Sequence, residues 1–266
     1  MHYFIFPNKD SYISETSPSH ILEHPDSTNK NYGHDELLEL KKSFLNSHSS
    51  SSYDVSRILI QFDYSDIQNE INNGNITNPR YFLRLYEVEG QKEIINSYTI
   101  GAHVVSQSWE EGTGAHYNNP KVTSGVTWES ASADGIWKIE GTTGDVVTFN
   151  SYHSEFDNAD RKFGTQLVMT DDFVTSGSRN TQGGGVYFME SNFETSQSFS
   201  NESPDIEMDI TDIVNKHIDN LVDNNGFLLK YSGSYEDDIS SQSLKFFSKQ
   251  THTIYSPKLE VRWNDS

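Results

Sequence analysis

The fold is decided by one stretch of the chain, which reads Ser56-Arg57-Ile58-Leu59-Ile60-Gln61-Phe62-Asp63. Successive side chains of a β-strand point to opposite faces, so Ile58, Ile60 and Phe62 share one face. Leu59 makes the opposite face apolar as well. Nearly continuous apolar runs are typical of strands covered on both sides, so we expect a second sheet or a neighbouring subunit to cover this one.

Similar short runs recur along the chain, between segments rich in Asn, Ser, Gly and Asp. They fall at residues 80–86, 98–105, 226–231, 244–247 and 258–263. Short strands separated by polar turns are typical of antiparallel sheets. The sequence therefore predicts an all-β protein, with a jelly-roll-like antiparallel β-sandwich formed as a single domain over residues 1–266.

Two short helices and one long polar segment interrupt the strands. Residues 65–71 begin at a capping Ser and place Ile67 and Ile71 one helical turn apart, and residues 211–222 carry a longer apolar stripe. Residues 129–204, rich in Ser, Thr, Asn, Asp and Gly, are expected to leave the sandwich as a loop and hairpin excursion. The core strands would then lie in about 1–128 and 205–266.

Composition excludes several classes of function. The 266 residues contain 19 Lys and Arg against 39 Asp and Glu, which gives a net charge of −20. Such a charge repels phosphate, so nucleic acid and anionic membranes are poor partners. The absence of cysteine excludes disulfides, thiol nucleophiles and thiolate metal sites. The opening segment Met1 to Pro7 lacks the basic region of a signal peptide, so we expect synthesis in a cytoplasm.

Acidic residues in the excursion are weak candidates for a structural calcium site. Asp157, Asp160, Asp171 and Asp172 supply the oxygen ligands that Ca²⁺ takes, although none follows the EF-hand pattern. Among 39 acidic residues, adjacent pairs arise by chance, so solvated loops are the simpler interpretation. We expect no other cofactor.

No motif in the sequence identifies a catalytic residue. There is no GxSxG motif, and the Gly-rich run 182–185 lacks the following Lys of a phosphate-binding loop. Glu110 and Glu111 are adjacent, so on a strand their carboxylates would point to opposite faces rather than converge on a glycosidic bond. We therefore expect a protein that is not an enzyme.

Aromatic residues offer a binding function instead. Trp109 and Trp128 lie in polar, loop-rich surroundings, and exposed indole rings there could stack on sugars. The alternative is that both rings pack in the core, as we expect for Trp263, which alternates with Leu259 and Val261.

Taken in chain order, the strands and turns resemble the DNRLRE-type β-sandwich module, also classed as carbohydrate-binding module family 96. The resemblance rests on residues 10–13, 31–33, 36–40, 56–63, 82–86, 108–112, 125–128, 209–214, 226–230, 246–248 and 257–261. It covers nearly the whole chain except the excursion. Arg57 and Asp63 match the family motif, and the resemblance implies that they anchor the sheet rather than bind a ligand.

Within that family, the chain is similar to solitary forms that serve as virion structural proteins of large contractile-tailed bacteriophages. The similarity rests on residues 4–7, 183–187, 246–248 and 263–266. It implies a multi-copy component of the neck, tail or an appendage, in contact with other virion proteins, with host-surface glycans as a further candidate partner. The alternative function is a carbohydrate-binding module that recognises a cell-surface polysaccharide through Trp109 and Trp128.

Overall fold

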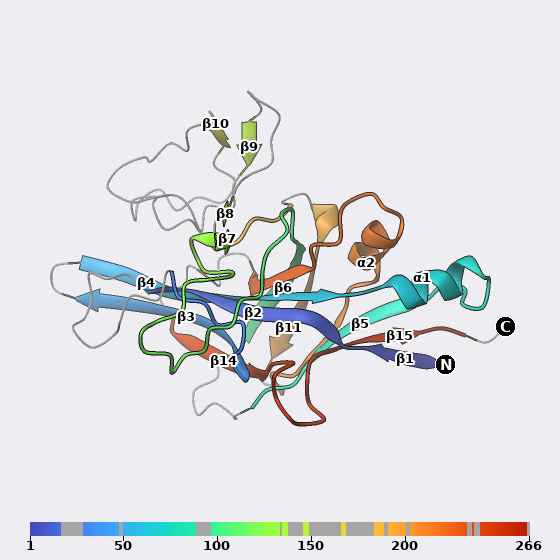
Figure 1. Cartoon of the computed structure of the whole chain (residues 1–266), viewed down its shortest axis with the longest axis horizontal. Helices are drawn as coiled ribbons and strands as arrows, with labels where there is room; N and C mark the ends of the chain where they lie inside the picture. The colour runs from blue at the N-terminus through green and yellow to red at the C-terminus, as the bar shows by residue number, and fades with distance from the viewer. Residues whose placement is uncertain are drawn as a thin grey trace.

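The computed structural model describes residues 1–16, 29–47, 50–88, 97–133, 135–137, 146–148, 166–168, 184–188, 191–200, 203–232, 236 and 240–264. They form antiparallel sheets with two short α-helices (Figure 1). The predicted all-β, antiparallel sandwich is therefore confirmed.

The smaller main sheet has four strands. Their order is β1 (His2–Ile5), β15 (Lys258–Arg262), β5 (Arg80–Leu85) and β12 (Ile206–Asp209). Alternate side chains of β5 are buried, namely Tyr81, Leu83 and Leu85, while the residues between them are more accessible. This sheet therefore has one face on the core and one toward solvent, the usual arrangement for an antiparallel sheet.

The larger sheet has seven strands. Six follow the order β11 (Glu194–Ser200), β6 (Ser97–Val104), β13 (Phe227–Tyr231), β4 (Ser50–Phe62), β3 (Leu37–Ser47) and β14 (Gln242–Phe247), and β2 (Pro7–Thr16) pairs with β4 outside this path. The stretch that predicted the fold lies in β4, which pairs with β13, β3 and β2. The apolar run is thus a central strand.

Both faces of β4 are covered, as its sequence predicts. Ile58, Ile60 and Phe62 belong to the main core, which includes Leu83 and Leu259 of the smaller sheet. Side chains on the opposite face of the larger sheet form a second cluster with three tryptophans of the loop layer, which we define as residues 105–137. The chain therefore supplies this second cover itself, and no neighbouring subunit is needed for it.

One continuous segment belongs to both sheets. β1 pairs with β15 in the smaller sheet, and β2, which begins just beyond Phe6, pairs with β4 in the larger one. The register of β2 is irregular between Pro7 and Lys9. Proline has no backbone N–H to donate to a strand ladder, which suits Pro7 to the point where the chain changes sheets.

The two predicted helices are present. α1 (Ser65–Asn72) buries Ile67, and α2 (Thr211–Ile218) buries Ile213, Val214 and His217. α2 ends before the predicted residue 222, because Asn220 adopts a left-handed conformation with φ of 55°. No helix in the described part of the chain is long and apolar enough to cross a membrane.

The predicted excursion, residues 129–204, contains more of the sandwich than expected. β7 (Ser130–Ser132) pairs with β8 (Gly135–Ile136), and β9 (Val146–Thr148) pairs with β10 (Gln166–Val168). β11, however, pairs with β6 along its whole length and forms an edge of the larger sheet. Phe199 is its one large apolar residue, so the composition of an edge strand was mistaken for that of a loop.

Candidate functional site

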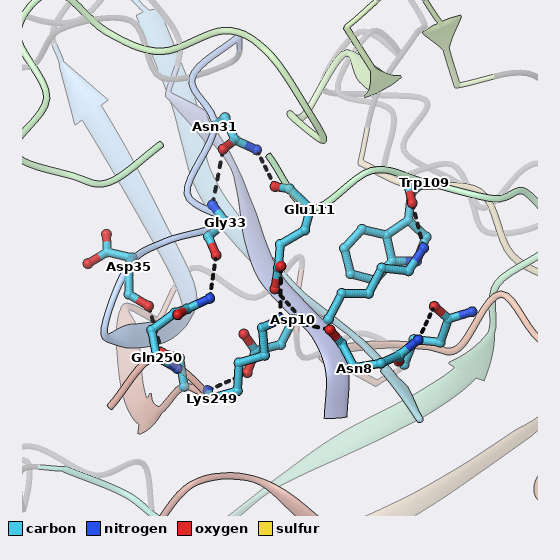
Figure 2. Close-up of polar contacts among 12 residues, drawn as sticks. Asn8, Asp10, Asn31, Gly33, Asp35, Trp109, Glu111, Lys249 and Gln250 are labelled. Atoms are coloured by element: carbon cyan, nitrogen blue, oxygen red, sulfur yellow. Dashed lines mark hydrogen bonds and ion pairs between the residues drawn. The ribbon is translucent and has the colours of Figure 1, made fainter. Parts of the chain in front are cut away.

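The loop layer is held to the sandwich by the buried amide of Asn31, whose side chain forms four hydrogen bonds. Figure 2 shows those to Gly33 and Glu111. Its Nδ2 donates to the carbonyl oxygens of Glu111 and Val126, both at 2.7 Å. Its Oδ1 accepts from the backbone N–H of Gly33 at 3.2 Å and of Gly114 at 2.7 Å. One side chain therefore fixes three segments that are far apart in the sequence.

Glycines permit this close approach. A Cβ at Gly33 would lie 2.0 Å from the carbonyl oxygen of Glu111, and one at Gly112 would lie 2.4 Å from Oδ1 of Asn31. The backbone of Gly112 also has φ of +78°, a conformation that residues with a Cβ rarely adopt. These residues, which carry much of the resemblance noted in the sequence, thus contact one another.

Trp109 is buried, so its ring follows the core-packing alternative and not the exposed one. Only 3% of it is exposed, and its Nε1 donates to the carbonyl oxygen of Asn225 at 2.9 Å. Nζ of Lys9 lies 4.5 Å from the ring centroid and donates to the carbonyl oxygen of Trp109 at 2.5 Å. One face of the ring is therefore covered by a cation of the same chain.

Trp128 is buried to the same degree, with 3% exposed. The guanidinium carbon of Arg57 lies 5.0 Å from its ring centroid, and its carbonyl oxygen accepts from the N–H of Gly184 at 2.7 Å. Of the two alternatives, core packing holds for both tryptophans, because their rings lie on an apolar sheet face that includes Ile13 and Leu228. Neither ring can stack on a sugar in this packing.

Arg57 lies at the centre of a buried charge cluster. Its Nε and Nη2 donate to the two carboxylate oxygens of Glu236 at 3.0 and 3.2 Å, and its Nη1 donates to the carbonyl oxygen of Gly184 at 2.5 Å. Nζ of Lys230 lies 3.1 Å from Oε2 of Glu236. Burial alone would raise the pKa of Glu236, but the charges of Arg57 and Lys230 outweigh it and hold that pKa below its ordinary value.

Asp10, Glu111 and Lys249 form a second charged group (Figure 2). The N–H of Asp10 donates to Oε1 of Glu111 at 2.9 Å, and the N–H of Lys249 donates to Oδ2 of Asp10 at 2.7 Å. Nζ of Lys249 is 2.9 Å from Oε2 of Glu111. Burial raises the pKa of Asp10 to about 7, so this carboxyl group titrates near neutral pH.

These charged groups have the residue types of an acid–base site without the access that one needs. Asp10 is 1% exposed, and its Oδ1 has no hydrogen-bond partner. Arg57 and Glu236 are equally buried and bonded to each other. A general acid must come within hydrogen-bond reach of a substrate atom, and neither Asp10 nor the pair of Arg57 and Glu236 reaches the surface for that purpose.

The predicted calcium ligands Asp157, Asp160, Asp171 and Asp172 lie outside the described residues. Within the described ranges, no three His, Asp or Glu side chains come together in a way that could hold a metal ion. Asp63, which matches the family motif, is exposed, and its Oδ1 accepts from the N–H of Ser65, the first residue of α1, at 2.9 Å.

Four of the large apolar side chains that are exposed in the described part of the chain lie in the N-terminal segment. Met1, Tyr3, Phe4 and Phe6 are 71%, 45%, 38% and 57% exposed. Trp263, which the alternation assigned to the core, is half-buried and packs against the core from the edge. The apolar opening of the sequence was a signal for this surface.

Two surface grooves flank these residues, and Met1 and Trp263 line both. One, of about 490 Å³, lies over the solvent-facing side of the smaller sheet beside Phe82 and Arg262. The other, of about 540 Å³, lies between β1 and α1 and is also lined by Tyr3.

Comparison of the chain with models of known protein families and with curated proteins found no match.

Proposed function

We propose that this chain is a non-enzymatic structural protein of a tailed-bacteriophage virion, a multi-copy component of the neck, the tail or an appendage. The ordered motifs that resemble the DNRLRE-type sandwich proteins of such phages suggest this function. The structural observation that carries the proposal is the exposed apolar surface around β1.

A folded chain of this kind gains free energy by burying large apolar side chains, roughly 1.5 to 3 kcal/mol for each one that becomes fully buried. The larger sheet is covered on both faces, yet Met1, Tyr3, Phe4 and Phe6 stay exposed together on one short segment. Tyr3 and Phe4 point to opposite faces of β1, so apolar surface is exposed on both sides of this strand. Exposed apolar surface of this kind marks contact sites with other molecules. This supports a role in assembly.

The buried charges support a role without catalysis. Arg57 and Lys230 compensate the charge of Glu236 inside the chain, and Glu111 and Lys249 pair beside Asp10. Each group links segments that are distant in sequence, so each contributes to the fold. Glycan binding through Trp109 and Trp128 loses its support, because both rings are covered by residues of the same chain.

The test is density-gradient purification of intact particles, a high-salt wash, and quantitative mass spectrometry. We expect this protein in the particle band at a constant ratio to the major capsid protein. The ratio would separate a ring or fibre at one vertex from a decoration of the whole head. Recovery in the soluble fraction alone would overturn the proposal and would make glycan-array binding the next question.

A further inference from the structure

β1 presents a free backbone edge. The N-terminal amine of Met1 donates to the carbonyl oxygen of Trp263 at 2.7 Å, and the N–H of Trp263 donates back to Met1 at 3.2 Å. Hydrogen-bonded pairs alternate along an antiparallel ladder, and the register places Tyr3 opposite Val261 as the next such pair. The N–H and C=O groups of His2 and Phe4 therefore face away from β15.

In the described part of the chain, no strand pairs with β1 on that side. Soluble proteins usually protect such an edge with charged side chains or proline. The opposite edge strand of the same sheet, β12, carries Glu207 and Asp209, each in an ion pair with an arginine. β1 carries no Asp, Glu, Lys or Arg, and its exposed residues are aromatic. The edge is thus suited to an added strand.

The groove between β1 and α1 indicates which side chains that strand would carry. Tyr3 and Trp263 supply aromatic rings, and the charged side chains that line the groove are Asp66 and Glu70 of α1. Both acidic residues are exposed, and Oε2 of Glu70 accepts from Nδ2 of Asn75 at 2.7 Å. Carboxylates next to aromatic rings attract Lys or Arg, and the net charge of −20 steers a basic partner toward the chain.

We propose that the free edge of β1 binds an extended strand of a partner protein, with Lys or Arg side chains directed toward the groove at Asp66 and Glu70. Alternate, apolar side chains of that strand would lie beside Phe4 on the opposite face. The inference rests on the proposed function and names the kind of partner that the assembly would supply. β1 has four residues, so each contact is short, and many copies in a particle would strengthen it.

The test is fluorescence polarisation of the full chain with a labelled peptide of alternating lysine and valine residues. We expect saturable binding that Phe4→Pro weakens at least about tenfold, because proline removes an outward N–H without breaking a bond to β15. A peptide of equal charge with a central proline should bind about tenfold more weakly than the alternating one. Thermal unfolding verifies that Phe4→Pro still folds.

The role of charge is tested with the double variant Asp66→Asn, Glu70→Gln. We expect a loss of about tenfold in peptide affinity, whereas Asp212→Asn with Asp223→Asn, which removes equal charge from exposed positions elsewhere, should leave affinity unchanged. Absence of peptide binding, or equal binding by wild type and the β1 and α1 variants, would overturn the proposal.

Other occupants of the β1 edge or of the groove beside α1 would give different results. A dimer in sedimentation equilibrium that Phe4→Pro abolishes would make a second copy of this chain the occupant and overturn the proposal. Glycan retention that Tyr3→Ala abolishes would assign the groove to a sugar and overturn it as well. The peptide assay needs no particles, so its failure is distinguishable from failure to find the protein in virions.

Discussion

Arg57 and Glu236 meet through two hydrogen bonds, of 3.0 and 3.2 Å, where neither side chain is more than 1% exposed. Removal of one charge from a buried pair leaves the other uncompensated. We expect Glu236→Gln to lower the free energy of unfolding by about 3 to 5 kcal/mol, measured by urea denaturation. Arg80→Met, which breaks the exposed pair with Asp209, should cost at most about 1 kcal/mol. Equal losses would contradict the placement of the Arg57 pair in the interior.

Asn31 should be the residue of the loop layer least tolerant of change. Asn31→Ala removes four hydrogen bonds and leaves buried backbone groups of Glu111, Val126 and Gly114 without their partner. We expect a loss of about 3 kcal/mol in unfolding free energy. Asn8→Ala, which removes one exposed bond to Gln61, should change it by less than about 0.5 kcal/mol. A small effect at Asn31 would show that this layer is held by other contacts.

Asp10 should make the chain less stable as pH rises. Its pKa is raised from 3.8 to about 7 by burial, so the folded state binds more protons than the unfolded state between these values. The stability that the protonated group provides is present below about pH 4 and is lost as pH rises through 7. Asp10→Asn keeps an acceptor for the N–H of Lys249. Its free energy of unfolding should exceed that of wild type by about 4 kcal/mol near pH 8, with little difference near pH 4.

The measurement is urea denaturation of wild type and Asp10→Asn across that pH range. A difference in unfolding free energy that stays constant with pH would contradict the raised pKa.

His217 should make the chain less stable as pH falls, which is opposite to the effect of Asp10. Burial lowers its pKa from 6.5 to about 4, and its ring packs near Tyr64 and Phe227 at centroid distances of 5.8 and 5.3 Å. Between these pKa values the unfolded state binds more protons, so stability falls as pH decreases from 6.5 toward 4. We expect His217→Leu to remove up to about 3 kcal/mol of that pH dependence. An NMR titration of the ring with a midpoint above pH 6 would contradict this account.

The apolar patterns of the sequence predicted most of the fold. The alternation around Ile58 and Ile60 identified a strand covered on both faces, and the short apolar stripes identified α1 and α2. β11 escaped detection because an edge strand is stabilised largely by backbone pairing, which leaves little apolar periodicity. The strand pattern could not reveal that the loop layer, and not another subunit, covers the outer face.

The site was harder to predict because exposure depends on tertiary packing. Trp109 and Trp128 have polar neighbours in sequence, and only the folded chain shows that both rings pack on the larger sheet. The pairing of Arg57 with Glu236 joins residues 179 positions apart, a separation that local patterns do not encode. The exposed Tyr3 and Phe4 were visible as an apolar opening, but the sequence did not show that β1 would be an edge strand.

The central claim is that this chain is an assembly protein that docks through its N-terminal strand. Hydroxyl-radical footprinting of purified particles and of the free protein tests it most directly. The account predicts several-fold lower oxidation of Met1, Tyr3, Phe4 and Phe6 in the particle, with the exposed residues Tyr117 and Leu221 as internal references. Equal oxidation of the N-terminal residues in both samples would contradict it.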